Sequence, residues 1–421
     1  MAKIIVEKSG PLHGEVVISG AKNAVLPIMA ATLLSEETCE IKSVPALKDV
    51  EIMCRIIEAL GAKVEPDLAN NCVNITARGV ETTEAPQELV TKMRASILAM
   101  GPLLARFGSA TIHLPGGCAI GERPTELHIK GLRALGATVE VDTVNDVITA
   151  RANRLYGNTI YLDFPSVGAT ENIIMAATLA EGTTIIENAA QEPEITDMAN
   201  FLNKMGARIK GAGTDTVRII GVESLHGARH NVIPDRIEAG TFMVAAAITH
   251  GAVLVKNVLP DHIKPIIAKL RECGAEVIPV DEGLVVQATD RRLTSTDIKT
   301  LPYPGFPTDM QAIFMALLTT VDGASAVIET VFENRYMHVP ELKKMGASIK
   351  TDDRCALVTG NARLKGSKVQ ATDLRAGAAM VLAGLVADGR TEVTNIYHIQ
   401  RGYEHFVEKM QGLGAKIHLE E

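Results

Sequence analysis

The segment from Asp49 to Ala62, DVEIMCRIIEALGA in one-letter code, shows the pattern that organises this chain. Its apolar residues recur at helical spacing, and Gly61 then supplies the left-handed backbone conformation that commonly ends a helix. Five similar tripeptides follow: Leu135-Gly136-Ala137, Met205-Gly206-Ala207, Cys273-Gly274-Ala275, Met345-Gly346-Ala347 and Leu413-Gly414-Ala415. Their glycines follow at intervals of 75, 70, 68, 72 and 68 residues. The 421-residue chain therefore consists of six similar units.

Each unit also contains a second helical segment that is apolar nearly all round and rich in alanine and methionine. These segments span residues 24–34, 96–105, 172–180, 239–249, 310–319 and 376–386. A helix without a polar face is buried on every side. Alternating runs that read as strands, such as residues 137–141, follow the amphipathic helices. The pattern predicts an α/β fold of two similar domains, each with three buried helices at its centre and with sheet and amphipathic helices outside.

The composition excludes several classes of protein. Hydrophobic residues make up 47% and charged residues 22%, as in soluble globular proteins, and no run of 18 uncharged apolar residues indicates a membrane span or leader. The net charge of −8, with 3% aromatic residues and no basic tail, argues against nucleic acid as a partner. The six scattered cysteines form no Cys-x-x-Cys pair, which favours the cytoplasm and no metal site.

Polar residues stand at the amino-terminal ends of the six buried segments. They are Lys22 and Asn23; Lys92 and Arg94; Ser166, Thr170 and Glu171; Asp235 and Arg236; Thr308 and Asp309; and Asp373 and Arg375. Any one of them could simply cap its helix. Because a helix amino terminus carries about half a positive charge, two opposed sets of such ends would instead form an anion-binding site.

The loop Pro115-Gly-Gly-Cys-Ala-Ile-Gly-Glu-Arg-Pro124 is the strongest candidate for chemistry. Its three glycines permit unusual backbone conformations, and a cation such as Arg123 would favour the thiolate of Cys118. Gly116 and Gly121 have Walker-loop spacing, but Glu122 stands where a phosphate-binding lysine is required.

Seven motifs together resemble the UDP-N-acetylglucosamine enolpyruvyl transferases (1-carboxyvinyltransferases) of the EPSP synthase-like superfamily, and the resemblance covers essentially the whole chain. The motifs are Ser19 to Asn23, the Cys118 loop with Arg123-Pro124, Ser166 to Thr170, Pro234-Asp235-Arg236, Pro307-Thr308-Asp309, Phe332 to Arg335 and Asp373-Leu374-Arg375. The resemblance implies an inside-out α/β barrel in which each domain has three βαβαββ units. It places residues 22–233 in the first domain and residues 1–21 with 234–421 in the second.

The resemblance also implies transfer of enolpyruvate from phosphoenolpyruvate to the 3-hydroxyl of UDP-N-acetylglucosamine, the first committed step of peptidoglycan synthesis, without metal or organic cofactor. By resemblance, Cys118 is the acid near C3 and Asp309 takes or relays the hydroxyl proton. Lys22, Arg123 and Arg401 hold phosphoenolpyruvate, Arg94 tunes the site, and Asn23 orients the sugar.

The same resemblance supplies the nucleotide contacts: Arg123, Pro124, Thr125, Glu126, Leu127, Ser166, Val167, Gly168, Asp309 and Val331. Arg335 and Asp373 are implied as supports that pair with other site residues. Where some relatives carry a lysine two residues before Ser166, this chain has Phe164, which puts one polar contact in doubt. The oligomeric state does not follow from the sequence.

Three alternatives stay open on the sequence. An enolpyruvyl transferase acting on shikimate 3-phosphate would share the fold but would need more basic residues and no Cys118 loop. A non-catalytic repeat clamp would need a basic lining, which the acidic helix starts Asp235, Asp309 and Asp373 do not offer. A cysteine hydrolase is disfavoured because neither His113 nor His128 suggests a dyad with Cys118, and both histidines read as structural.

Overall fold

The structure is a computed structural model that describes residues 2–67, 70–113 and 125–421. Their backbone contacts divide these residues into two compact units. Unit 1 contains residues 2–19 and 234–421, and unit 2 contains residues 20–113 and 125–233. Each unit has its own cluster of buried apolar side chains, drawn from residues 4–18 and 237–417 in unit 1 and from residues 21–232 in unit 2.

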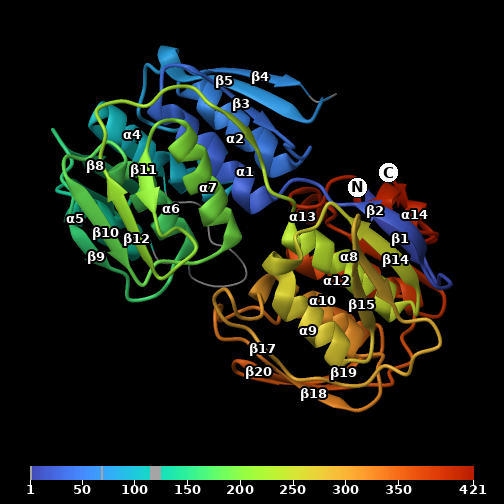
Figure 1. The fold of residues 1–421 in the computed structure, drawn as a ribbon. Helices are drawn as coiled ribbons and strands as arrows, with labels where there is room; N and C mark the ends of the chain where they lie inside the picture. The colour runs from blue at the N-terminus through green and yellow to red at the C-terminus, as the bar shows by residue number, and fades with distance from the viewer. Residues whose placement is uncertain (1, 68–69, 114–124) are drawn as a thin grey trace. The chain divides into compact units, whose positions relative to one another are not determined.

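Unit 2 contains the first three repeats (Figure 1). The first has α1 (Lys22–Ala31) with a 3₁₀ turn at Thr32–Leu34, β3 (Thr38–Lys42), α2 (Lys48–Ala59), β4 (Lys63–Asp67), β5 (Cys72–Thr76) and a 3₁₀ turn at Ala77–Gly79. The second has α3 (Gln87–Val90), a 3₁₀ segment η4 (Arg94–Ala99), α4 (Met100–Phe107), β6 (Ser109–His113), α5 (Glu126–Ala134), β7 (Thr138–Asp142) and β8 (Val147–Arg151). The third has β9 (Thr159–Tyr161), α6 (Val167–Ala177), β10 (Thr183–Glu187), α7 (Pro193–Lys204), β11 (Arg208–Lys210) and β12 (Thr216–Ile220), and β13 (Arg229–Asn231) follows it.

Unit 1 begins with β1 (Lys3–Glu7) and β2 (His13–Val17) and contains the other three repeats. The fourth has α8 (Arg236–Ile248), β14 (Ala252–Lys256), a 3₁₀ turn at Pro260–Ile263, α9 (Lys264–Glu272), β15 (Glu276–Val280) and β16 (Gly283–Gln287). The fifth has β17 (Ile298–Lys299), a 3₁₀ turn at Thr308–Met310, α10 (Gln311–Leu318), β18 (Ala324–Ile328), α11 (Val339–Lys344), β19 (Ser348–Asp352) and β20 (Cys355–Thr359). The sixth has β21 (Lys368–Gln370), α12 (Leu374–Val386), β22 (Arg390–Thr394), α13 (Tyr397–Gln400), α14 (Phe406–Gly412) and β23 (Ile417–Glu420).

The repeated glycines end the amphipathic helices as the sequence predicts. Gly61, Gly136, Gly206, Gly274, Gly346 and Gly414 all have φ between 93° and 104°. A side chain at this φ is strained, so glycine is the residue that ends the helix here without cost. The predicted α/β architecture, with three repeats in each unit, is confirmed.

One predicted helix differs in detail. The sequence predicts a continuous helix over residues 96–105, but the structure has the 3₁₀ segment η4 up to Ala99 and an α-helix only from Met100. Pro102 lacks the N–H that an uninterrupted α-helix would donate to the carbonyl of Leu98. A proline is tolerated in the first turn, so α4 begins just before it.

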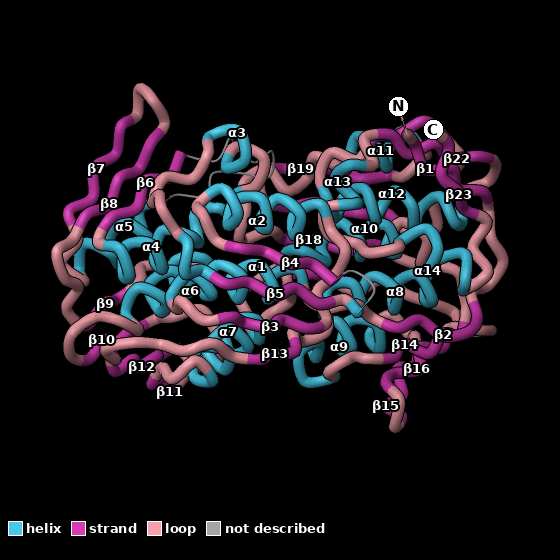
Figure 2. The backbone as a smooth tube through the Cα atoms, turned by 90° about the horizontal axis from the view of Figure 1, so that it is seen from above, coloured by secondary structure: helices cyan, strands magenta, loops and turns pink. Residues whose placement is uncertain are grey.

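The chain passes from unit 1 to unit 2 after β2 and returns to unit 1 after β13, and each of these strands joins a sheet of the unit that the chain leaves. Strand β2 precedes α1 in sequence but pairs in parallel with β14, in the order β15-β16-β14-β2. Strand β13 precedes α8 but pairs in parallel with β3, in the order β13-β3-β5-β4. Strand β1 lies between β22 and β23 and so completes the last repeat (Figure 2). Each unit therefore completes a sheet with a strand that precedes a helix of the other unit.

Candidate functional site

The predicted site residues fall into two sets, one in each unit, and most lie at the amino-terminal ends of the buried helices. In unit 2 these helices are α1, η4 with α4, and α6. In unit 1 they are α8, α10 and α12. Cys118, Arg123 and Pro124 lie outside the described residues.

Lys22 begins α1, and a buried carboxylate holds its side chain. The Nζ atom lies 3.3 Å from Oδ2 of Asp49, which comes from the first turn of α2. The two side chains are only 12% and 2% exposed. Asp49 is a partner of Lys22 that the sequence analysis did not identify, because an acidic residue in a first helical turn is expected anyway as a partner of the helix dipole. Asn23 follows in the same turn and is partly buried.

Arg94 begins η4 and brings a second positive charge to this set. Its field acts together with burial to lower the pKa of His128 to about 4, which places the Arg94 guanidinium near that imidazole. His128 therefore stays neutral at physiological pH.

The two predicted nucleotide segments of unit 2 lie together, although about forty residues separate them in sequence. Thr125 to Leu127 lead into and begin α5, and Ser166 to Gly168 lead into and begin α6. His128, in the first turn of α5, lies against Gly168, where an added Cβ would be 3.3 Å from Cε1 of the ring. The structure thus brings two helix amino termini together, an arrangement that favours anions.

Phe164 stands two residues before Ser166, where some relatives carry a lysine. Its side chain is 43% exposed, and its carbonyl accepts a hydrogen bond from the N–H of Ser166 at 2.7 Å. The backbone of Phe164 thus helps to fix the turn that leads into α6.

In unit 1, Asp309 is held by two arginines. Nη2 of Arg335 donates to Oδ1 at 2.8 Å, while Nε and Nη2 of Arg375 donate to Oδ2 at 3.2 and 3.0 Å. Both arginine side chains are 3% exposed. Charge-assisted bonds of this kind favour the ionised carboxylate and fix its orientation.

Arg375 is in turn fixed by Tyr403, which precedes α14. The guanidinium carbon lies 5.2 Å from the centre of the Tyr403 ring, and the phenol oxygen lies 2.9 Å from Oγ1 of Thr241 in α8. The two arginines are therefore parts of a buried network that connects Thr241 in α8, the 3₁₀ turn before α10 and the start of α12. The sequence analysis named Arg335 and Asp373 as supports, but it did not assign Arg375 a role.

Glu329 organises the segment around Val331. Its carboxylate is fully buried and accepts hydrogen bonds from the hydroxyls of Thr300 and Thr308, both at 2.9 Å. It also accepts from the N–H groups of Val331 and Phe332 at 2.8 and 3.2 Å. Val331 is thereby fixed close to the turn that carries Asp309. No motif in the sequence points to Glu329, because its partners come from three separate segments.

Asp373 caps α12 by accepting from the N–H groups of Arg375 and Ala376 at 2.8 and 3.0 Å. Arg401 follows α13. Burial and the field of Arg401 lower the pKa of His398, and Asp373 opposes them. The charges of Arg401 and Asp373 therefore both act at His398.

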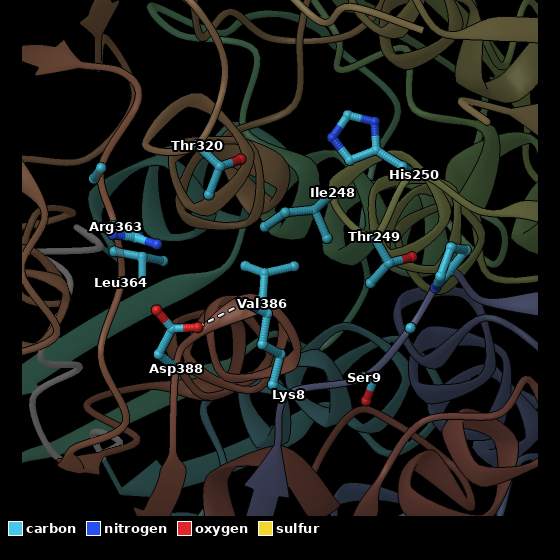
Figure 3. A pocket seen from close by; sticks show the side chains of 13 residues that line it. Lys8, Ser9, Ile248, Thr249, His250, Thr320, Arg363, Leu364, Val386 and Asp388 are labelled. Carbon is cyan, nitrogen blue, oxygen red and sulfur yellow. Dashed lines mark hydrogen bonds and ion pairs between the residues drawn. The ribbon is translucent and has the colours of Figure 1, made fainter. Parts of the chain in front are cut away.

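The carboxyl ends of the unit 1 helices form a pocket of about 310 Å³ (Figure 3). It is lined by residues that end α8 and α12, such as Ile248 and Val386, and by the ion pair of Lys8 with Asp388, whose atoms are 2.6 Å apart. None of the predicted site residues that the structure describes lines this pocket. In unit 1, Asp309 and Asp373 lie instead at the opposite, amino-terminal ends of α10 and α12.

Within the described parts of the chain, no group of three or more His, Cys, Asp or Glu side chains is placed to hold a metal ion. Of the helices in residues 2–67, 70–113 and 125–421, none combines the length and apolar character that crossing a membrane requires.

Comparisons with known proteins agree over nearly the whole chain. The sequence profile of the family described as EPSP synthase (3-phosphoshikimate 1-carboxyvinyltransferase) matches residues 6–410. The chain is 59% identical over 99% of both lengths to UDP-N-acetylglucosamine 1-carboxyvinyltransferase 1 of Caldanaerobacter subterraneus subsp. tengcongensis. It is also 59% identical, over 99% of its own length and 98% of the relative's, to UDP-N-acetylglucosamine 1-carboxyvinyltransferase of Finegoldia magna.

Solved structures show the same fold. The enolpyruvyl transferase NikO from Streptomyces tendae superimposes with a TM-score of 0.90 at 26% identity, covering 99% of this chain and 98% of that one. EPSP synthase from Acinetobacter baumannii superimposes with a TM-score of 0.77 at 18% identity over the full length of both chains.

Proposed function

The chain belongs to the EPSP synthase family, and from this premise we propose that it transfers the enolpyruvyl group of phosphoenolpyruvate to the 3-hydroxyl of UDP-N-acetylglucosamine and releases phosphate. The observation that carries the proposal is the 59% identity, over 99% of both chains, to a UDP-N-acetylglucosamine 1-carboxyvinyltransferase. In the cell this reaction begins peptidoglycan synthesis.

The chemistry is an addition followed by an elimination. The sugar oxygen bonds to C2 of the enol as a proton is added at C3, and the resulting tetrahedral intermediate then loses C3–H and phosphate to restore the double bond. This sequence needs an acid at C3, an acceptor for the hydroxyl proton, and positive charge for the phosphate and carboxylate. We assign these roles to Cys118, to Asp309, and to Lys22, Arg123 and Arg401 respectively, with Arg94 adding positive charge.

The contacts of Asp309 suit an acceptor of the hydroxyl proton. Two buried guanidinium groups keep its carboxylate ionised, so it can accept a hydrogen bond from a sugar hydroxyl at neutral pH. The same contacts make it a weak base. Asp309 therefore acts by orienting the hydroxyl and by taking the proton late, as the new C–O bond forms and the hydroxyl becomes more acidic.

Nucleotide binding is assigned mainly to unit 2. The starts of α5 and α6 supply backbone N–H groups at Thr125 to Leu127 and at Ser166 to Gly168, together with Arg123 and Pro124. Asn23 orients the sugar, and Asp309 and Val331 contribute from unit 1. Arg335 and Asp373 support the site through Asp309 and through the start of α12.

The proposed substrates are small metabolites, and the reaction requires no membrane or nucleic acid partner. The five cysteines in the described part of the chain, Cys39, Cys54, Cys72, Cys273 and Cys355, are all free thiols. Free thiols are typical of a reducing compartment, which supports the proposal that the protein acts in the cytoplasm.

A phosphate-release assay with phosphoenolpyruvate tests the acceptor directly. We expect phosphate release to depend on UDP-N-acetylglucosamine and to be absent with shikimate 3-phosphate. Release with shikimate 3-phosphate alone would assign the chain to the other branch of its family.

The role of Cys118 is tested with a small epoxide phosphonate. The Cys118→Asp variant should retain turnover, because a carboxylic acid can also deliver a proton, but it should no longer be alkylated, because the soft nucleophile is gone. Intact-mass spectrometry measures the label. A variant that still carries the adduct would remove Cys118 from the proposed role.

A further inference from the structure

His128 is placed at the point where α5 meets α6. It occupies the first turn of α5 and is 8% exposed. The edge of its ring lies over Gly168 in the first turn of α6, where an added Cβ would be 3.3 Å from Cε1 and 3.4 Å from Nε2. A Cβ at residue 168 would be in tight contact with the imidazole. The glycine therefore lets the ring lie close against the amino-terminal end of α6.

A buried amide determines which ring nitrogen carries the hydrogen. Oδ1 of Asn172 accepts from the N–H of Gly101 at 2.6 Å, so Nδ2 must be the donor atom. Nδ2 donates to the carbonyl of Ile97 and lies 3.0 Å from Nδ1 of His128. Nδ1 is therefore an acceptor, and in the neutral ring the hydrogen is on Nε2.

The imidazole stays neutral because it is buried and because Arg94 is near, which together lower its pKa to about 4. Its Nε2–H has no hydrogen-bond partner among the described residues. This donor lies beside the first turn of α6, where Val167 and Gly168 carry N–H groups without an intrahelical acceptor. The Ser166 hydroxyl oxygen accepts from the N–H of Ala169 at 3.4 Å, so Ala169 is the residue of this turn whose N–H is capped.

We propose that His128 is a specificity-determining residue whose Nε2–H donates a hydrogen bond to a phosphate oxygen of the nucleotide diphosphate. The inference deepens the proposed function and rests on it for the identity of the ligand. The donor lies at the amino terminus of α5 and against that of α6, and the positive charge of Arg94 acts on the same ring. All three favour an anionic acceptor. Asn172 is the positioning residue that keeps the hydrogen on Nε2.

Titration calorimetry with UDP and with uridine tests the proposal on the full-length protein. His128→Leu removes the donor but retains an apolar side chain, and it should weaken UDP binding by about 10- to 100-fold, the usual value of a hydrogen bond to a charged group. Uridine binding should be unchanged, because uridine has no phosphate. His128→Gln, which can place an amide N–H near the former Nε2, should recover most of the UDP affinity.

The matched control is His113→Gln. His113 is another partly buried histidine of unit 2, and its Nε2 lies 3.6 Å from Oε1 of Glu84. This variant should bind UDP like the wild type. In steady-state assays, His128→Leu should raise KM for the UDP-sugar while kcat and KM for phosphoenolpyruvate change little.

Equal weakening of UDP and uridine would overturn the proposal, since it would show that the ring only supports packing. A contact with the uracil is excluded if uridine binding is unchanged. If His128→Leu does not fold, the wild-type protein labelled with ¹⁵N-histidine still decides the matter by NMR. UDP, but not uridine, should then shift the Nε2 resonance of His128, and an unmoved resonance would contradict the contact. Wild-type protein that binds UDP but shows no turnover would instead count against the proposed reaction.

Discussion

The two units share one fold but differ in the chemistry at the start of their buried helices. In unit 1, the carboxylates Asp235 and Asp373 cap α8 and α12, and Asp309 precedes α10. In unit 2, Lys22 and Arg94 begin helical segments, and the neutral Ser166 caps α6 through a single 3.4 Å hydrogen bond. The same architecture therefore presents positive side chains and a weakly capped helix start in one unit, and carboxylates in the other, of which Asp309 is bound by two arginines.

The comparison shows how a repeated scaffold acquires distinct roles. Helix amino termini whose N–H groups have no acceptor can bind the anionic groups of a substrate. At the start of α10, two buried arginines instead hold the carboxylate of Asp309 in a defined orientation. Four experiments test this contrast.

The largest effect is expected from Arg375→Leu in unit 1. The substitution removes the hydrogen bonds that Arg375 donates to Asp309 and the cation that lies over Tyr403. Breaking one side of a buried ion pair costs about 3–5 kcal/mol of unfolding free energy. Urea denaturation measures the loss, and the exposed Arg363→Leu is the control, expected to change stability by no more than about 0.5 kcal/mol. A loss in Arg375→Leu as small as that of the control would show that the network does not support unit 1.

Acid should destabilise both units through one buried histidine in each. Burial lowers the pKa of His338 in unit 1 and of His128 in unit 2 to about 4, with Arg335 and Arg94 adding to the effect and Asp373 opposing it at His338. The unfolded chain takes up these protons near pH 6.5 while the folded chain does not, so stability falls as pH decreases from about 6.5 to 4.

Each histidine should contribute on the order of 3 kcal/mol to that loss. Urea midpoints at pH 6.5 and 4.5 check this expectation in the wild type and in His338→Gln and His128→Gln. Each variant should lose less stability between the two pH values than the wild type does. Identical pH dependence in all three proteins would contradict the assignment.

A smaller difference is expected between two glycines of the buried helices. A Cβ at Gly101 in unit 2 would lie 2.4 Å from the backbone oxygen of Asn172, which cannot move independently. A Cβ at Gly240 in unit 1 would meet the ends of Ile266 and Met310 at 2.9 Å, and these can adjust. Gly101→Ala should therefore lose about 1–3 kcal/mol, while Gly240→Ala should be nearly neutral because alanine favours the helix. Thermal unfolding of the two variants provides the comparison, and equal losses would refute it.

The smallest effect concerns the caps themselves. Oδ1 of Asp235 accepts from two N–H groups, those of Ile237 and Glu238, at 2.8 and 3.0 Å, whereas Ser166 makes one longer bond. Asp235→Ala should cost about 1–2 kcal/mol and Ser166→Ala about 0.5 kcal/mol. Chemical denaturation resolves the two values, and a larger loss in the serine variant would reverse the proposed contrast between the units.

Much of the fold could be predicted from the sequence because its signals are local. The tripeptide at Gly61 and its five counterparts end helices wherever they occur, and apolar segments such as residues 239–249 can only be buried. The polar residues that begin these helices are visible for the same reason. Which sheet a strand joins is not local, and no pattern within β2 or β13 indicates that the two are exchanged.

The partners of the site residues could not be predicted in this way. Lys22 meets Asp49 from the next helix, and Asp309 meets Arg375 from 66 positions further along the chain. The sequence analysis interprets His128 as structural. Only its position over Gly168 shows that its Nε2–H is a donor without an acceptor among the described residues. Contacts between distant segments arise from packing, which residue spacing alone does not specify.

The pairing of β1 and β2 with strands that come much later in the sequence has a consequence for circular permutation of the chain. Lys3 of β1 is the antiparallel neighbour of Glu420 of β23, so these two residues lie side by side. A short linker from Glu421 to Ala2, with new ends opened between Ser19 and Gly20, would give a circularly permuted protein in which residues 20–233 and then all of unit 1 are contiguous. In the present order, β1 and β2 precede their partners β22 and β14 by more than two hundred residues. The permuted chain brings β1 close in sequence to β22 and β23, so less loop-closure entropy opposes this pairing, and the chain should refold faster.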